Sequence, residues 1–509
     1  MSQKVAKATY HVLLGTVAGR VINLIALLAV TSAIGPEGFG LLLIVGIITG
    51  LFDILLDIGF ENYYIIKVDL KDKSELQSAR VDEIEQAIFK LRLISNLSLF
   101  ALQIGVSYAL AGILFDAPVD TYLRILAFNY IANIAGKINE VRMKKRMEFG
   151  AITFSRFISN LISAILRVLM VFTGYGILGW AVGLVSGTFV YNLLLYKFGT
   201  FRPRKTRFSD DVKKEILWFA KHSWFMGVGQ YLHAQSSNWI LKTFNTIGEI
   251  GLIKFAASYT LDLHSAMFSS QSQLLFSYYS NHKEQPERIL NAIHLMAAMG
   301  YISLGIPLIL GIVFTAPIIG LIFNQQWQPA VAITSLYCMY TLIRISYSPG
   351  LGIHLATGKL KIGSLVTYLQ LAITVVVLAL IGLNDGSIFA FAVAVVIVNI
   401  LGENLKVFSG LFFLKIYPAH FMKKNGRLLI IVAILVLMAF GIRHLFIVDT
   451  ILSLFIVASV LYILQFLLLW QFDRNLSRQL LQRLSIILTN SGIPAIESIG
   501  NRIQYKIKP

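Results

Sequence analysis

Residues 11–60 read HVLLGTVAGRVINLIALLAVTSAIGPEGFGLLLIVGIITGLFDILLDIGF. The stretch consists of two long apolar runs that are separated only by a short segment containing Gly35, Pro36 and Gly38. About 20 predominantly apolar residues are enough for a helix to cross the hydrocarbon core of a bilayer. Glycine and proline close together end one helix and allow the chain to turn into the next. The stretch therefore predicts two membrane-spanning helices joined by a tight turn.

The same apolar character continues along the whole chain. Of its 509 residues, 56% are hydrophobic and only 14% are charged, whereas soluble domains carry about 25% charged residues. The single cysteine, Cys338, excludes an internal disulfide framework and a Cys-rich metal site, and we expect no cofactor. The fold class that follows is an all-α polytopic membrane protein with about 14 transmembrane helices, at 11–34, 39–66, 93–115, 121–136, 150–172, 175–196, 216–244, 247–276, 289–314, 330–348, 362–383, 387–405, 428–445 and 450–472.

The net charge of +18 orients the protein in the membrane. With the N-terminus in the cytoplasm, 35 of the 44 lysines and arginines fall in the cytoplasmic segments, and the outer side carries only Arg443. Such a bias places the basic side of a membrane protein in the cytoplasm. We therefore expect both termini to be cytoplasmic, a basic segment at 142–146 to contact anionic membrane lipids, and nucleic acid not to be a partner.

A second glycine-containing turn, at 247–251, occupies the position before span eight that the turn at Gly35 occupies before span two. Matching turns predict a parallel repeat of two six-span halves. We expect an N-terminal lobe at 1–198 (spans 1–6), a cytoplasmic linker at 199–215, a C-terminal lobe at 216–408 (spans 7–12), spans 13–14 within 409–472, and a cytoplasmic amphipathic tail at 473–509. The periodicity of Val81, Ile84 and Ile88 also predicts an amphipathic surface helix ahead of span three.

Five expected spans carry polar side chains along one helical face. Charged groups in a membrane are costly, so such faces point to a bundle interior or to water, and we expect them to line a hydrated cavity. The clearest face belongs to span five, with Arg156, Asn160, Ser163 and Arg167 at steps of four, three and four residues. The expected cavity cations are Arg20, Arg156, Arg167 and Lys254, and the expected neutral polar groups are Asn23, Asn160, Ser163, Gln230, His233 and Ser258.

Several of these residues also have a purely structural interpretation. Asp53, Asp57 and Asp262 are candidates for coupling carboxylates, because a carboxylate in a low dielectric binds a proton more readily. Alternatively, these acids only neutralise Arg20 and Lys254 in ion pairs between helices. Arginines near span ends can extend to the interface, and this is what we expect of Arg344 and of one of the two arginines of span five.

Several short motifs resemble one family of transporters. They are Gly35-Pro36-x-x-Phe39-Gly40, Asp57-Ile58-Gly59, the start of span eight from Gly251, and Leu321-Ile322-Phe323 followed by Trp327 and Ala330. Over residues 1–405 the chain resembles the Wzx-like polysaccharide transporters, which are lipid-linked oligosaccharide flippases of the MATE/MurJ-type superfamily. Ile253-Lys254 departs from that pattern, in which a tyrosine and a neutral residue are expected.

The resemblance implies a two-lobed, V-shaped transporter in the bacterial inner membrane. It would move a polyprenyl-pyrophosphate-linked glycan (an O-antigen, exopolysaccharide or capsule repeat unit) to the outer leaflet by alternating access. It also implies a polysaccharide polymerase and a chain-length regulator as partners.

Two other functions remain alternatives. A MATE-like exporter of small molecules shares the fold, but a site for cationic drugs favours carboxylates over the arginines and lysine found here. A membrane-embedded glycosyltransferase or polymerase needs acid or base residues on external loops, and the outer loops here are short. The sequence has no GxxxxGK[ST] phosphate-binding loop, so direct use of ATP is not expected.

Overall fold

The computed structural model describes residues 3–56, 60, 63, 64, 68, 75–110, 119–146, 148–204, 209–357, 359–474, 476–480 and 482. In these residues all regular secondary structure is helical. The chain divides into two compact units, Met1–Asn238 (unit 1) and Trp239–Pro509 (unit 2), with the boundary inside helix α7 (Asp210–Phe244). The lobe boundaries expected around the linker 199–215 stay a prediction.

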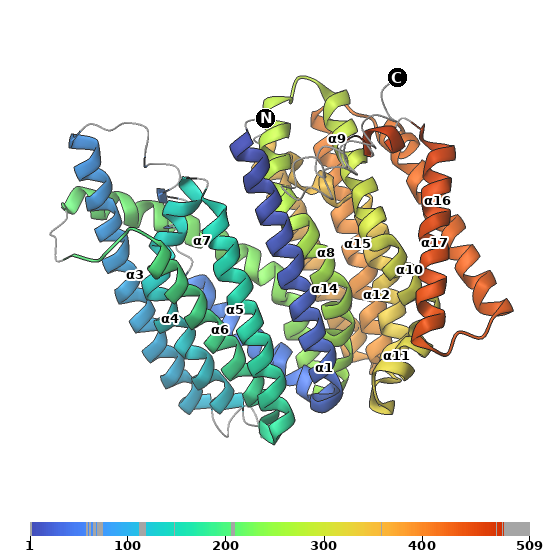
Figure 1. Ribbon diagram of the computed structural model, residues 1–509, viewed down its shortest axis with the longest axis horizontal. Coiled ribbons are helices and arrows are strands. Elements are labelled where there is room, and N and C mark those ends of the chain that lie inside the picture. Colours follow the sequence, from blue (N-terminus) through green and yellow to red (C-terminus); the bar gives the residue numbers. More distant parts are fainter. Residues whose placement is uncertain are drawn as a thin grey trace. The chain divides into compact units, whose positions relative to one another are not determined.

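Unit 1 is a helical bundle formed by the first half of the chain (Figure 1). Its first helix, α1, is kinked at Gly35, which has a φ of 64° and is followed by Pro36. Glycine adopts such a positive φ without the steric cost that other residues incur. The predicted turn between the first two apolar runs is thus confirmed. The elements of unit 1 are α1 (Gln3–Leu56), α3 (Glu75–Leu110), α4 (Val119–Lys145), α5 (Phe149–Met170), the π-helix η1 (Val171–Tyr175), α6 (Gly176–Phe198) and most of α7.

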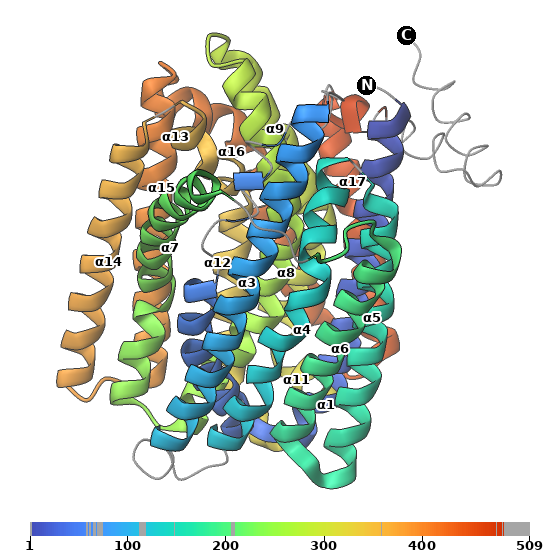
Figure 2. The ribbon, with the colours of Figure 1, turned by 90° about the vertical axis from the view of Figure 1, so that its left-hand side faces the viewer.

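Helices α5 and α6 form a hairpin whose members lie side by side (Figures 1 and 2). The chain reverses at Gly174 and Gly176, whose φ angles are 94° and 50°. Glycines on α6 then let α5 approach closely, because a Cβ atom at Gly187 would lie only 2.7 Å from the Cβ of Ser163. Small residues at such interfaces are a common means of packing membrane helices.

The beginning of α3 corrects one expectation from the sequence. Ile84 and Ile88 are buried in a cluster with Ile138 of α4, Phe201 and Ile216. The predicted amphipathic surface helix is therefore wrong, because this segment is the first part of α3 and packs inside unit 1. Its apolar face is covered by protein rather than by lipid, and periodicity alone does not distinguish the two.

Unit 2 begins its helices with a capped turn. The hydroxyl of Thr246 accepts a hydrogen bond from the amide of Glu249, whose carboxylate accepts one from the amide of Thr246, which is a capping box. The elements that follow are α8 (Ile247–Asn281), α9 (Pro286–Gly300), η2 (Tyr301–Gly305), α10 (Ile306–Val313), α11 (Thr315–Ile322), η3 (Gln325–Trp327), α12 (Ala330–Ile345), η4 (Ser348–Gly352), α13 (Ile353–Ala356), α14 (Leu360–Leu383), α15 (Ile388–Phe413), α16 (Pro418–Leu445) and α17 (Ile451–Phe472).

The last two long helices belong to the core of unit 2. Leu435 of α16 and Leu461 of α17 are fully buried in one cluster with Ile309 of α10. Leu476, in the first turn of the expected tail, is buried in the same cluster. The remainder of that tail, 483–509, lies outside the described residues.

Eight helical segments of the described chain are long and apolar enough to cross a membrane. Two of them each cover two expected spans: Ile25–Leu55 crosses the kink at Gly35, and Phe149–Phe198 contains both arms of the α5–α6 hairpin. The other expected spans lie on α4, α7, α8 and α12; the first three carry more polar side chains, and α12 has only 16 residues. The predicted all-helical membrane fold is thus confirmed in outline, whereas the count of 14 crossings is taken up under the proposed function.

Candidate functional site

In the second half of α5, the polar face packs against other helices of unit 1. Arg167 is 3% exposed. Its guanidinium donates to the side-chain oxygen of Asn23 on α1 and to the carbonyl of Ser163 at 3.2 Å, and it lies 4.7 Å from the ring centroid of Trp180 on α6. Arg167 therefore joins α1, α5 and α6, a geometry that favours a helix-joining role over contact with a mobile ligand.

The neighbours of Arg167 on this face are also occupied by packing. Ser163 is buried against Gly187, and a Cβ atom at Gly19 of α1 would lie 2.5 Å from the amide nitrogen of Asn160. Asn23 itself donates to the carbonyl of Gly19 at 2.9 Å. The structure thus brings four predicted residues of α1 and α5 together, but as a packed interface inside unit 1.

Arg156, near the beginning of α5, is different, because 48% of its side chain is exposed. Its guanidinium donates to the hydroxyl of Tyr191 on α6 at 3.4 Å and lies 5.7 Å from the centroid of that ring. It also lies 3.8 Å from a carboxylate oxygen of Glu140 on α4. The guanidinium is thus held from two sides and remains accessible, as a side chain that binds a ligand must be.

Glu140 gathers three cations around one buried carboxylate. It lies beyond the expected span 121–136 and is 3% exposed, while the ammonium groups of Lys144 and Lys137 lie 2.8 Å and 2.9 Å from its two oxygens. Burial alone would raise the pKa of Glu140, but the two lysines lower it to about 2. We call Lys137, Glu140, Lys144, Arg156 and Tyr191 the Glu140 cluster.

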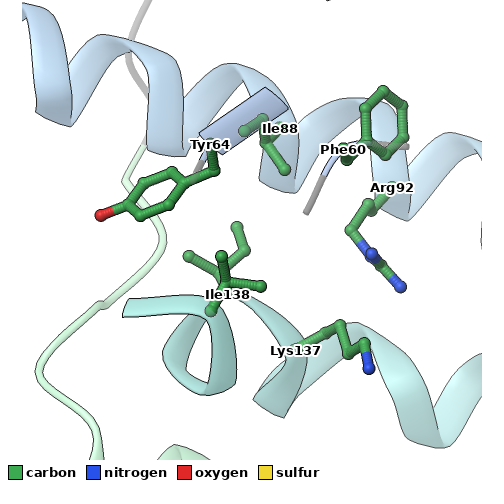
Figure 3. A pocket seen from close by; sticks show the side chains of 7 residues that line it. Phe60, Tyr64, Ile88, Arg92, Lys137 and Ile138 are labelled. Carbon is green, nitrogen blue, oxygen red and sulfur yellow. The ribbon is translucent and has the colours of Figure 1, made fainter. Parts of the chain in front are cut away.

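A small pocket adjoins Lys137 between α3 and α4 (Figure 3). Arg92 of α3 and Lys137 of α4 extend toward the same end of the pocket, and the hydroxyl of Tyr64 lies at the opposite end. Tyr64 donates to Glu85 at 2.6 Å, and Arg142 lies 3.2 Å from the same carboxylate. The remaining lining is apolar, with Phe60, Ile88, Ile138 and Val141. The pocket is thus a largely buried, apolar site with two cationic side chains at one end.

The predicted carboxylates are only partly within the described residues. Asp53 of α1 is exposed and accepts a hydrogen bond from Tyr130 of α4. Asp57 lies outside the described residues, as do the side chains of Arg20, Gln230, His233 and Asp262. The proposed pairing of Arg20 with Asp53 or Asp57 therefore stays a prediction.

In unit 2, the predicted residues Lys254 and Ser258 lie one turn apart on α8, with Lys254 half-buried and Ser258 buried. A larger polar group in this unit includes Glu403, which is not among the residues predicted from the sequence. Arg344 of α12 pairs with Glu403 of α15 at 2.7 Å, with 20% and 11% of their side chains exposed, and Tyr340 donates to Glu403 at 3.4 Å. The expectation that Arg344 extends to the interface is wrong, because a partner on α15 holds it inside the unit.

Glu140 and Glu403 are not among the residues predicted from the sequence, although each has a signal there. Glu403 is an acid inside the expected span 387–405, and the rule that selected Asp53 also applies to it. Glu140 stands three residues after Lys137 and four before Lys144, the spacing at which helical side chains interact. The approach of Arg156 from another helix had no local signal.

Comparison with known proteins identifies the family. Residues 31–332, more than half of the chain, match the family described as polysaccharide biosynthesis protein. The chain belongs to this family. The resemblance to Wzx-type transporters that the short motifs predicted is confirmed.

Several known proteins are similar to this polysaccharide biosynthesis protein in sequence or in fold. The chain is 20% identical over 383 residues to an uncharacterized membrane protein in the cps region of Klebsiella pneumoniae, covering 74% of this chain and 76% of that protein. Its fold is similar to the lipid II flippase MurJ in an inward closed conformation, with a TM-score of 0.67, 16% identity, and 92% and 99% of the two chains covered. An outward-facing multidrug resistance MATE family transporter gives a TM-score of 0.56, 13% identity, and 81% and 95% coverage. At these identities the two structures show a common fold.

The Glu140 cluster and the Arg344–Glu403 pair differ in whether they lie in the region that matches the family. All members of the Glu140 cluster lie within residues 31–332, whereas Arg344 and Glu403 lie after the matched region. The accessible cation therefore belongs to the part of the polysaccharide biosynthesis protein by which the family is recognised.

Proposed function

We propose that this polysaccharide biosynthesis protein is a flippase. Its substrate is a polyprenyl-pyrophosphate-linked oligosaccharide, a repeat unit of capsule, exopolysaccharide or O-antigen, which it moves from the cytoplasmic to the outer leaflet by alternating access. It acts as a transporter rather than an enzyme. Family membership supports this proposal, and so does a relative encoded in a cps region.

The observation that carries the proposal is the half-exposed guanidinium of Arg156 on a helix of this transporter fold. A planar guanidinium can bind a phosphate oxygen pair with two parallel charge-assisted hydrogen bonds. A cationic-drug exporter needs the opposite charge at this position. A pyrophosphate headgroup is therefore the ligand that fits the exposed group best.

The topology that goes with this function has fourteen crossings and two cytoplasmic termini in the bacterial inner membrane. Residues 1–198 and 216–408 are the two six-span lobes, 199–215 the linker, 409–472 the last two spans and 473–509 the tail. A polymerase and a chain-length regulator would receive the exported repeat unit.

The other predicted residues have graded roles in this proposal. Arg156 contacts the pyrophosphate directly, with Arg20 as a second candidate on unit 1, while Arg167 positions the helices that carry the site. Lys254 of unit 2 stays a predicted cavity cation. Of the neutral polar groups predicted from the sequence, Gln230 and His233 contact the sugars in this proposal. Asn23, Asn160 and Ser163 instead pack α1, α5 and α6 together, and Ser258 is buried on α8. Three carboxylates are the candidates for energy coupling. Asp53 is exposed in the described part of the chain, and Asp57 and Asp262 are the other two.

The test is export of the glycan by cells that carry the matching polysaccharide locus, with the protein replaced by variants at equal membrane levels. Arg156→Ala should reduce export at least roughly tenfold. Arg156→Lys should restore part of it, because lysine keeps the positive charge but lacks the planar guanidinium. Mass spectrometry of lipids that co-purify with the wild type should find a polyprenyl-pyrophosphate glycan. Full export by Arg156→Ala, or co-purification of drug-like molecules in place of the glycan lipid, would overturn the proposal.

A further inference from the structure

The Glu140 cluster has the construction of a phosphate site, and Arg156 is the one residue that it shares with the polar face that the sequence predicted for span five. Three cations from α4 and α5 surround one carboxylate among the described side chains. The carboxylate is almost fully buried, but the lysines are 25% and 31% exposed and Arg156 is 48% exposed. The carboxylate is thus shielded by protein, and the three cationic side chains lie at the surface of unit 1.

We propose that Lys137, Lys144 and Arg156, held together by Glu140, bind the phosphate group of a membrane lipid at the cytoplasmic end of unit 1. Each cation can donate a charge-assisted hydrogen bond to phosphate oxygens. Glu140 is a positioning residue, because it keeps three like charges close together that would otherwise repel one another. Tyr191 fixes the plane of the guanidinium by its hydroxyl at 3.4 Å.

The neighbouring surface suits a lipid rather than a free phosphate ion. Exposed apolar side chains flank Arg156 along α5, because Phe154 is 52% exposed and Leu161 is 36% exposed, and Leu193 of α6 is 67% exposed. A ligand that carries a phosphate on an apolar chain can contact both surfaces. Two sources supply this chemistry: the prenyl pyrophosphate of the transported lipid, and an anionic phospholipid of the membrane.

The first source rests on the proposed function, and the second does not. In the first case the cluster is a loading site, at which the headgroup is bound from the cytoplasmic leaflet before translocation. In the second case it holds a structural phospholipid between α4 and α5. Both require the same organised set of cations.

The decisive variant is Glu140→Gln. A diffuse basic surface would bind phosphate more tightly after loss of a negative charge, since its attraction is the sum of its charges. An organised site should bind more weakly, because the cations separate when the carboxylate that holds them is lost. The two explanations therefore predict opposite signs for a single substitution.

The experiment measures lipid binding to the full-length protein by native mass spectrometry, with farnesyl pyrophosphate and phosphatidylglycerol titrated separately. Lys144→Gln and Glu140→Gln should each weaken binding by roughly tenfold, the scale of one hydrogen bond to a charged group. Lys197→Gln, an exposed lysine in the last turn of α6, makes the same charge change as Lys144→Gln and should leave binding unaltered. Lys144→Gln also keeps the test valid if Glu140→Gln does not fold.

Weakening for farnesyl pyrophosphate alone identifies the loading site, and weakening for phosphatidylglycerol alone identifies a phospholipid site. Either result supports the phosphate site. Unchanged binding of both lipids by the Lys144 variant, or tighter binding by Glu140→Gln, would overturn it. A wild-type protein that binds phosphate lipids at this cluster yet exports no glycan would contradict the proposed function and leave the site standing.

Discussion

The Glu140 cluster of unit 1 and the Arg344–Glu403 pair of unit 2 are built from the same kinds of residue but differ in access. Each contains a buried carboxylate, a tyrosine and an arginine from another helix. The arginine of unit 1 is 48% exposed, whereas that of unit 2 is 20% exposed and only 2.7 Å from its acid. A mostly buried ion pair holds helices together, whereas an ion pair whose cation is exposed can also bind an anion.

Loss of the acid should therefore have its greatest effect on stability in unit 2. Glu403→Gln leaves the guanidinium of Arg344 without its anion in a mostly buried position, which should lower the free energy of unfolding by about 3 kcal/mol. The measurement is the thermal unfolding midpoint of purified protein in detergent. The double variant Arg344→Met/Glu403→Leu should recover most of the loss, because an apolar pair needs no counter-charge. An unaltered midpoint for Glu403→Gln would remove the distinction between the two regions.

In unit 1 the corresponding loss should appear in function. Arg156→Ala should reduce glycan export at least roughly tenfold, on the scale of a charged hydrogen bond, with little change in the unfolding midpoint because the side chain is half exposed. Export is measured as surface polysaccharide at matched protein levels. Arg344→Lys serves as the comparison, since it should affect the midpoint more than export. A large drop in stability for Arg156→Ala would show that both regions are structural.

The pH dependence of stability distinguishes the Glu140 cluster in a further way. The pKa of Glu140 is lowered from its ordinary value of 4.5 to about 2, so its ionised form stabilises the fold. That contribution is complete above about pH 4.5 and is lost as the pH falls through about 2. The difference in unfolding midpoint between wild type and Glu140→Gln should therefore shrink as the pH is lowered from about 5 to about 3. A constant difference over this range would show that the lysines do not stabilise the ionised carboxylate.

A smaller effect is expected for Asp53, which has one tyrosine partner and no cation among the described contacts of its side chain. Asp53→Asn should leave folding and lipid binding intact but remove the dependence of transport on an ion gradient. The measurement is flipping in proteoliposomes with and without an imposed proton or sodium gradient. If wild-type flipping ignores both gradients, Asp53 has a structural role.

The proposed topology places Lys424 on the cytoplasmic side of the membrane and Asn384 on the outer side, and cysteine labelling can check this. In a Cys338→Ser background, a cysteine at Lys424 should be protected from an impermeant thiol reagent added to intact cells, and one at Asn384 should be labelled. Reaction at Lys424 would contradict the fourteen-crossing topology.

The sequence predicted the fold better than the site, for physical reasons. Apolar length and turn chemistry are local, so the kink at Gly35 and the bounds of α5 and α6 could be anticipated within a few residues. Periodicity identified the polar face of α5 but not what covers it. Gly187 allows α6 to pack on that face, and such a contact between helices leaves no trace in the spacing of one helix. The exposure of Arg156 and the burial of Arg167 depend on the same contact.

The same limit explains why two of the predictions from the sequence were wrong. Ile84 and Ile88 form an amphipathic pattern that suits a membrane surface as well as a protein core, and only the packing of α3 against Ile138 decides between them. The position of Arg344 near a span end favours the interface, and its partner Glu403 stands too far along the chain to be recognised from local spacing.

The most direct test of the account is translocation by the purified protein. Proteoliposomes would carry a polyprenyl-pyrophosphate oligosaccharide in one leaflet, and a membrane-impermeant glycosidase would report its arrival in the other. The account predicts time-dependent cleavage with wild type, at least roughly tenfold slower cleavage with Arg156→Ala, and an unaltered rate with Lys197→Gln. Cleavage no faster than in protein-free liposomes, or equal rates for wild type and Arg156→Ala, would contradict it.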